Sequence, residues 1–142
     1  MRAEFVVKGE PVGKARPRVT RFGHAYTPET TVLYENLIKM EYERQCGDVY
    51  FQRGTPICLR VTAFHGIPKS ASKKKQAEML GGKIRPMSKG DLDNVVKTVG
   101  DALNGVAYDD DVQVVQIYAE RFYSDNPRIQ VGVQSVPDEE QE

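Results

Sequence analysis

Apolar and polar positions along the chain alternate in some segments and recur every three to four residues in others. Alternating or continuous apolar runs with β-branched residues predict four strands, at residues 4–8, 56–65, 112–122 and 128–134. The last two runs are joined by the sequence SDNP, whose Asn and Pro favour a turn. Residues 9–27 contain several Gly and Pro positions and predict a loop or an irregular hairpin.

Two longer segments have the helical period. The first helix is expected to begin after Thr27 as N-cap, with Pro28 at its first position, and to end at Gly47. Its core-facing stripe is expected to consist of its apolar residues, which are Val32, Leu33, Leu37, Ile38 and Met40.

The second helix is expected at residues 92–104, with Gly105 as its C-terminal stop. Its apolar face consists of Val95, Val99 and Leu103. Between the second strand and this helix, residues 66–90 read as loop with a short helix from Lys73 to Leu80.

The predicted element order is β-α-β-α-β-β, which favours one α/β (α+β) domain with a mixed β-sheet and helices packed on one face. The domain is expected to span residues 1–136. Residues 137–142 are expected to be an acidic, disordered tail.

The composition indicates a soluble globular protein, with 39% hydrophobic and 28% charged residues. No apolar run approaches the roughly 20 residues that a membrane-spanning helix needs, and the first ten residues lack a signal-peptide pattern. Cys46 and Cys58 form no CxxC pair and are expected to be buried free thiols. We therefore expect a cytoplasmic protein without a membrane partner.

The net charge of zero conceals an asymmetry between the two parts of the chain. Residues 1–90 carry 17 Lys and Arg against 8 Asp and Glu, whereas residues 91–142 carry 3 against 12. An asymmetry of this kind suggests a polyanionic partner for the basic part or an acidic tail. The tail accounts for four of the twelve acids, and most of the others lie within residues 91–111.

The acids of residues 91–111 are the strongest candidate for chemistry. Asp91 and Asp93 lie at the start of the second predicted helix, and Asp111 ends a run of three aspartates just before a strand. If the chain brings these three carboxylates together, their repulsion favours a bound cation, and oxygen ligands suit Mg²⁺ or Mn²⁺. The alternatives are helix capping by one aspartate and a solvated acidic surface.

Other metal sites fit the sequence poorly. The segment DLDN resembles the start of an EF-hand loop, but Val95 and Val96 stand where a ligand and the required glycine should be. A zinc site would have to draw on His24, His65, Cys46 and Cys58, which have no suitable spacing.

Basic residues precede the acids in two segments. The first is GKARPRVTR at residues 13–21, with Lys14, Arg16 and Arg18 as candidate contacts to DNA phosphates. The second lies within residues 66–90 and ends at Lys89, a fourth candidate DNA contact. A basic loop alone is most often solvated surface, but beside an acidic metal centre it suits phosphodiester chemistry.

These segments resemble the RusA family of Holliday junction resolvases, which are crossover junction endodeoxyribonucleases. The resemblance is carried by GKARPRVTRFGHAYTP near the N-terminus and by KGDLDNVVKTVGDALNGVAYDDDVQV. It runs from Lys8 to about Tyr118.

The resemblance implies a homodimeric, metal-dependent nuclease that resolves four-way DNA junctions by paired nicks during recombination and repair. It implies Mg²⁺ (or Mn²⁺) as the ion and no small-molecule cofactor, and many members come from phages or prophages. The family's essential carboxylates match Asp91, Asp93 and Asp111, and its essential lysine matches Lys97. The assignment of the last carboxylate rests on Gln113 and Val114, which follow the aspartates as in the family.

Several roles stay open at the level of sequence. Lys97 could act on the phosphate, or it could form a helix ion pair with Asp93 or Asp101. Asn94 could support the metal ligands or be a surface residue. The rival functions are a non-catalytic, structure-selective DNA-binding module, a phosphoryl transferase and an interaction protein with an acidic face. The sequence has no GxxxxGK[ST] or GxGxxG segment, and this absence argues against the transferase.

Overall fold

The computed structural model describes the chain except for residues 14–17, 24, 27 and 138–142, and the side chains of residues 18, 25 and 26. Four strands form the main sheet in the order β1-β6-β4-β5, with β1 at Arg2–Lys8, β4 at Ile57–Gly66, β5 at Val114–Ser124 and β6 at Arg128–Ser135. The pairs β1–β6 and β4–β6 are antiparallel and β4–β5 is parallel, which confirms the predicted mixed sheet. Two short strands, β2 (Arg18–Val19) and β3 (Ala25–Tyr26), pair as a separate antiparallel ladder inside the predicted loop or hairpin.

The short connection between β5 and β6 does not make a hairpin. β6 lies between β1 and β4 and has no pairing with β5, so the chain crosses the end of β4 after the SDNP turn. β4 is thereby paired on both sides, which agrees with its burial at six of ten positions.

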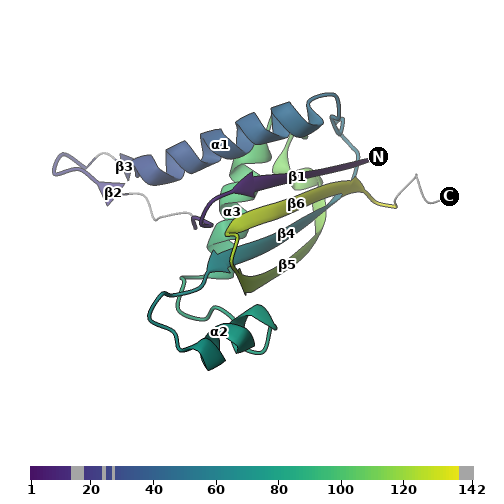
Figure 1. Cartoon of the computed structure of the whole chain (residues 1–142). Helices are drawn as coiled ribbons and strands as arrows, with labels where there is room; N and C mark the ends of the chain where they lie inside the picture. The colour runs from purple at the N-terminus through teal and green to yellow at the C-terminus, as the bar shows by residue number, and fades with distance from the viewer. Residues whose placement is uncertain (14–17, 24, 27, 138–142) are drawn as a thin grey trace.

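Helices α1 (Glu29–Cys46) and α3 (Leu92–Leu103) lie on one face of the sheet, as predicted (Figure 1). They pack against each other, α1 also packs on β1, and α3 packs on β4 and β5. The core between helices and sheet includes Phe5, Ile38, Leu59, Val99 and Val131. The predicted apolar face of α3 is confirmed, since Val95, Val99 and Leu103 are all buried.

Two predictions for α1 are wrong. Pro28 itself is the N-cap, without a side-chain cap bond, and the predicted N-cap Thr27 lies outside the described residues. The residues that face the core are Thr31, Tyr34, Ile38, Tyr42 and Cys46. Of the predicted stripe only Ile38 is buried, and the exposed members are Val32, Leu33, Leu37 and Met40.

The other predicted helices and strands hold with small shifts, whereas the predicted tail lies almost wholly outside the described residues. Helix α2 covers Lys73–Leu80, as expected, and projects from the body near the end of β5. β5 begins at Val114 because Asp111–Gln113 form a turn of 3-10 helix (η1) instead of strand. Cys46 and Cys58 are buried and free. Within the described part of the chain, no helix is both long and apolar enough to cross a membrane.

Candidate active site

Asp91 lies at the N-terminus of α3, and its carboxylate makes no capping hydrogen bond to the helix. Gly90 has a φ of 79°, a conformation that side chains disfavour, and it turns the chain into the helix at Asp91. Asp91 is the N-cap residue, but its side chain makes no capping hydrogen bond. Capping therefore does not explain this aspartate, and its exposed carboxylate is available at the positive end of the helix dipole.

Three further charged side chains follow along the exposed side of α3. Asp93, Lys97 and Asp101 are all exposed, and each step of four residues advances about 6 Å along the helix axis. No ion pair joins Asp93 to Lys97 in the described part of the chain. The predicted alternative role of Lys97, a helix ion pair with Asp93, is therefore absent. The Asp101–Lys97 pairing remains a prediction.

The aspartate run is held in a defined turn by Gln113. Its Oε1 accepts hydrogen bonds from the backbone N–H groups of Asp109 and Asp110, both at 3.0 Å. Asp110 Oδ1 in turn accepts from the N–H of Val112, which completes a capping box around η1.

The other end of the Gln113 side chain anchors this turn to the preceding loop. Its Nε2 donates to the carbonyl oxygens of Phe51, Gln52 and Thr55, at 3.3, 3.0 and 3.1 Å. Gln113 is only 6% exposed, so these bonds are shielded from water and fix the position of Asp110 and Asp111.

Asp110 and Asp111 interact directly. The hydrogen bond between their carboxyl groups raises the pKa of Asp111 above its usual value and lowers that of Asp110, which also accepts from Val112 N–H. The negative charge of Asp101 further raises the pKa of Asp111. Two carboxylates held this close repel each other when both are ionised, and a bound cation would relieve the repulsion.

The acidic residues occupy two ends of the α3 surface. Arg121 near the end of β5 donates to Gly90 O at 2.5 Å, which places Asp91 beside that end of the strand. At the other end of the helix, Tyr108 Oη donates to Gly100 O at 3.0 Å and holds the aspartate turn close to Asp101.

No group of three or more His, Cys, Asp or Glu side chains among the described residues has metal-binding geometry. The donors fit a hard divalent cation in chemistry, since all are carboxylate oxygens. The meeting of Asp91, Asp93 and Asp111 at one ion stays a prediction.

The basic N-terminal segment starts at the acidic helix. Gly13 lies against the first turn of α3, where an added Cβ would come within 3.2 Å of Asn94 Cβ. Asn94 therefore packs under the loop that leads into the basic segment. Lys14 and Arg16 lie outside the described residues, as does the side chain of Arg18. Lys89 is exposed directly before Gly90.

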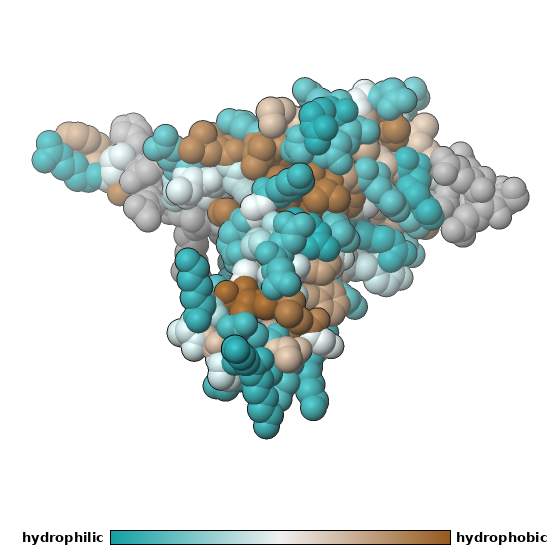
Figure 2. Space-filling view, in the orientation of Figure 1, coloured by the Kyte–Doolittle hydropathy of each residue, from teal (hydrophilic) through white to brown (hydrophobic). Residues whose placement is uncertain are grey.

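A second basic surface is formed by α2. Lys73, Lys74 and Lys75 are exposed in its first turn, and Figure 2 shows mostly hydrophilic side chains over this projecting part of the molecule.

His65 and Glu10 form a further polar pair at the end of β4. His65 Nδ1 lies 3.1 Å from Glu10 Oε1, and Glu10 Oε2 accepts from Gly66 N–H at 2.9 Å. Burial lowers the pKa of His65, and the charges of Arg121 and Lys89 lower it further, although Glu10 opposes both effects. The pair ties the loop after β1 to the sheet, near Arg121 and Lys89.

Sequence reasoning missed three of these features. The pattern Asp110-x-x-Gln113 matches a capping box and could have identified the role of Gln113. No sequence signal pairs Gly13 with Asn94 or Glu10 with His65, because each contact joins segments more than 50 residues apart.

Comparison with known proteins identifies the family of the chain. The family model "Endodeoxyribonuclease RusA" matches residues 8–134, which include both the basic segment and the acidic residues. The chain is also similar to the uncharacterized protein YqaN of Bacillus subtilis (strain 168), with 36% identity over 138 residues, 94% of this chain and 96% of the relative. Nucleases of the matched family bind junction DNA and depend on divalent metal ions in general. The chain belongs to the RusA family of endodeoxyribonucleases.

Proposed function

We propose that this chain is a Mg²⁺-dependent (or Mn²⁺-dependent) endodeoxyribonuclease that resolves four-way DNA junctions by paired nicks and acts as a homodimer. The observation that carries the proposal is the packing of Gly13 on Asn94, which joins the basic segment to the acidic surface of α3. A phosphate backbone held by the first would lie against the carboxylates of the second.

Asp91, Asp93 and Asp111 would hold one or two ions, with Asp91 and Asp93 at the start of α3 and Asp111 near its other end. The Asp91 side chain makes no capping hydrogen bond, and Asp93 is exposed two residues further on. The pKa of Asp111 is raised by the neighbouring Asp110. A divalent ion there would supply charge neutralisation on the phosphate and would acidify the attacking water.

The protein groups contribute positioning and charge. Lys97 has no ion pair with Asp93 and is free to donate to a non-bridging phosphate oxygen or to the leaving oxygen. Gln113 and Asp110 hold Asp111 in place. Lys14, Arg16, Arg18 and Lys89 would bind backbone phosphates around the cut strand.

Cleavage of a synthetic four-way junction tests this function. The wild-type protein should nick the junction in Mg²⁺ and not in EDTA, and Asp91→Asn should lose cleavage while binding the junction at least as tightly, because a negative charge near phosphate is removed. Asp48→Asn, at an exposed aspartate just after the C-cap of α1, serves as the matched control. Near wild-type cleavage by Asp91→Asn would refute the assignment of this residue.

A metal titration separates this proposal from a non-catalytic DNA-binding module. At a Mg²⁺ concentration ten times the dissociation constant, binding should stabilise the fold by about 1.4 kcal/mol. That gain should disappear in both Asp91→Asn and Asp111→Asn if the two residues hold the same ion. An unchanged melting temperature of the wild-type protein across the titration, with no cleavage, would favour the binding module.

A further inference from the structure

The segment that joins α2 to α3 is held at both of its ends by one residue of β5. Arg121 O accepts a hydrogen bond from Arg85 Nε at 2.8 Å, and Arg121 Nη1 donates to Gly90 O at 2.5 Å. Residues 85–90 are thereby closed into a loop on the edge strand, and the next residue along the chain is Asp91. We call residues 85–90 and their two hydrogen bonds to Arg121 the clip.

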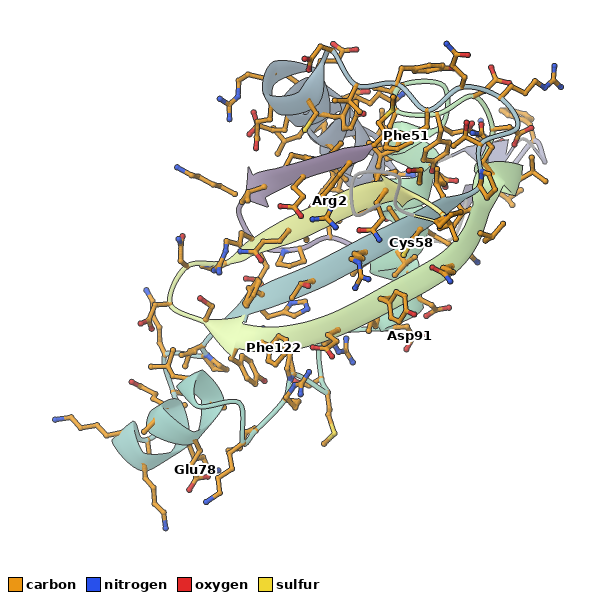
Figure 3. All side chains as sticks on the ribbon, turned by 90° about the vertical axis from the view of Figure 1, so that its right-hand side faces the viewer. Arg2, Phe51, Cys58, Glu78, Asp91 and Phe122 are labelled. Atoms are coloured by element: carbon orange, nitrogen blue, oxygen red, sulfur yellow. The ribbon has the colours of Figure 1, made fainter. Side chains whose placement is uncertain are left out.

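The start of the clip is also attached to the middle of the sheet by a stack of side chains. Arg85 Cζ lies 3.9 Å from the centroid of the Phe122 ring, and this ring stacks on Phe64 of β4 with the centroids 5.8 Å apart. Arg128 of β6 lies over Phe64, with its Cζ 3.9 Å from that centroid. Figure 3 shows Phe122 on the outermost strand, β5, at the end that lies beside α2.

The stack follows the strand pairing. Phe64 is the register partner of Phe122 in the parallel ladder and of Arg128 in the antiparallel ladder. A guanidinium group is attracted to the face of an aromatic ring, so the stack carries the rigidity of three paired strands to Arg85. The clip therefore begins at a fixed point of the sheet.

The end of the clip is held through the backbone, which leaves the Asp91 carboxylate open. Arg121 donates to the carbonyl oxygen of Gly90, and among the described residues it makes no ion pair with Asp91. Gly90 has a φ of 79°, and glycine has the widest backbone freedom of all residues. The hydrogen bond restricts that freedom at the residue directly before Asp91.

We propose that the clip positions Asp91 for a divalent ion, with Arg121 and Arg85 as positioning residues that act through the backbone of Gly90. The proposal rests on the proposed function, which gives Asp91 its role. Displacement of a reacting group by about 1 Å can cost about 100-fold in rate. Residues that orient metal ligands typically change metal affinity or activity by about 10–100-fold when they are replaced.

The alternative is that the clip only attaches α2 to the sheet. In that case its loss would lower stability and leave ion binding unchanged. Arg60 provides a matched control, because its Cζ lies 4.6 Å from the centroid of the Tyr118 ring. Arg60 comes four residues before Phe64 on β4, hence on the same face of the sheet, and it is not part of the clip.

Arg121→Met tests the end of the clip, because it removes the donor to Gly90 O. Hydrogen–deuterium exchange of the amides in residues 85–91 should become at least about 10-fold faster. Mn²⁺ affinity, measured by titration calorimetry on the protein without DNA, should fall by at least about 10-fold. Loss of a positive charge would by itself strengthen cation binding, so the sign of the change separates positioning from charge. Arg121→Lys keeps a donor and the charge and should recover most of the affinity.

Arg85→Lys tests the start of the clip without a change in charge, because lysine lacks the planar group that stacks on Phe122. Junction cleavage at saturating DNA should fall by about 10-fold. The dissociation constant for the junction in EDTA should stay within about twofold. Arg60→Lys loses an equivalent stack on Tyr118 and should cleave like the wild-type protein. Arg85 is exposed, so this variant decides the outcome if Arg121→Met fails to fold.

Unchanged or tighter Mn²⁺ binding by Arg121→Met would overturn the positioning role. Equal cleavage by the Arg85→Lys and Arg60→Lys variants would do the same. In both cases the wild-type protein still binds Mn²⁺ and nicks the junction, so the clip fails and the proposed function stands. A wild-type protein that neither binds Mn²⁺ nor nicks the junction would instead refute the proposed function, and the positioning role with it.

Discussion

Replacement of Gln113 by alanine should unfold the aspartate turn locally and lower the stability of the whole domain. The side chain satisfies two backbone N–H groups, at Asp109 and Asp110, and three carbonyl groups in residues 51–55. Alanine can replace none of these bonds. Because the side chain is only 6% exposed, water reaches the vacated partners poorly.

The size of the effect follows from these contacts. A net contribution of about 0.5–1.5 kcal/mol per hydrogen bond gives several kcal/mol for the set. The lower part of the range per hydrogen bond applies for two reasons. The side-chain amide of Gln113 shares two N–H donors among three carbonyls, and in the variant water can bond to some of the backbone groups that lose their partner. We expect the free energy of unfolding to fall by about 3 kcal/mol and the melting temperature by roughly 10 °C.

Urea unfolding followed by circular dichroism measures this loss, with Gln52→Ala, an exposed side chain in the same loop, as control. A positioning role adds a second expectation. At temperatures where Gln113→Ala is folded, junction cleavage should fall at saturating DNA while the dissociation constant for the junction stays within about twofold. A loss of less than about 0.5 kcal/mol, comparable with an ordinary surface substitution, would refute the anchoring role of Gln113.

Three further predictions concern other parts of the molecule. Tyr108→Phe removes the bond from a fully buried hydroxyl to Gly100 O and should cost about 1 kcal/mol in urea unfolding; no change would show that this bond contributes nothing. Because burial lowers the pKa of His65, the unfolded chain takes up its proton at higher pH than the folded chain, so stability should be fully present above pH 6.5 and fall as the pH drops below it. His65→Gln should reduce that slope between pH 7 and pH 5, and an unchanged slope would count against the effect. Lys14→Ala should weaken junction binding and lower the salt dependence of log K by about one unit, whereas an equal slope would argue against a phosphate contact.

The sequence by itself determined most of the elements and the family of the chain. The strands at β1, β4 and β6 and helices α2 and α3 follow from local periodicity and from glycine at the helix ends. The apolar face of α3 is unambiguous because it carries one apolar stripe, and the two dense motifs place the chain in its family without any coordinates.

The tertiary structure decided which helix face is buried and which strands pair, where the local sequence allows more than one arrangement. α1 carries two stripes, and only packing against β1 and α3 selects the one with Tyr34, Ile38 and Tyr42 over the one with Leu33, Leu37 and Met40. A short turn usually joins neighbouring strands, yet β6 pairs with β1 and β4, because partner choice depends on contacts far along the chain.

The neighbours of the acidic residues were also set by long-range contacts. Asp111 interacts with Asp110 and Asp101, and Gly13 meets Asn94, since the Gln113 anchor and the helix–sheet packing fix where these segments lie. Local sequence specifies which residues can make such contacts, and the burial of a shared core specifies which of them do.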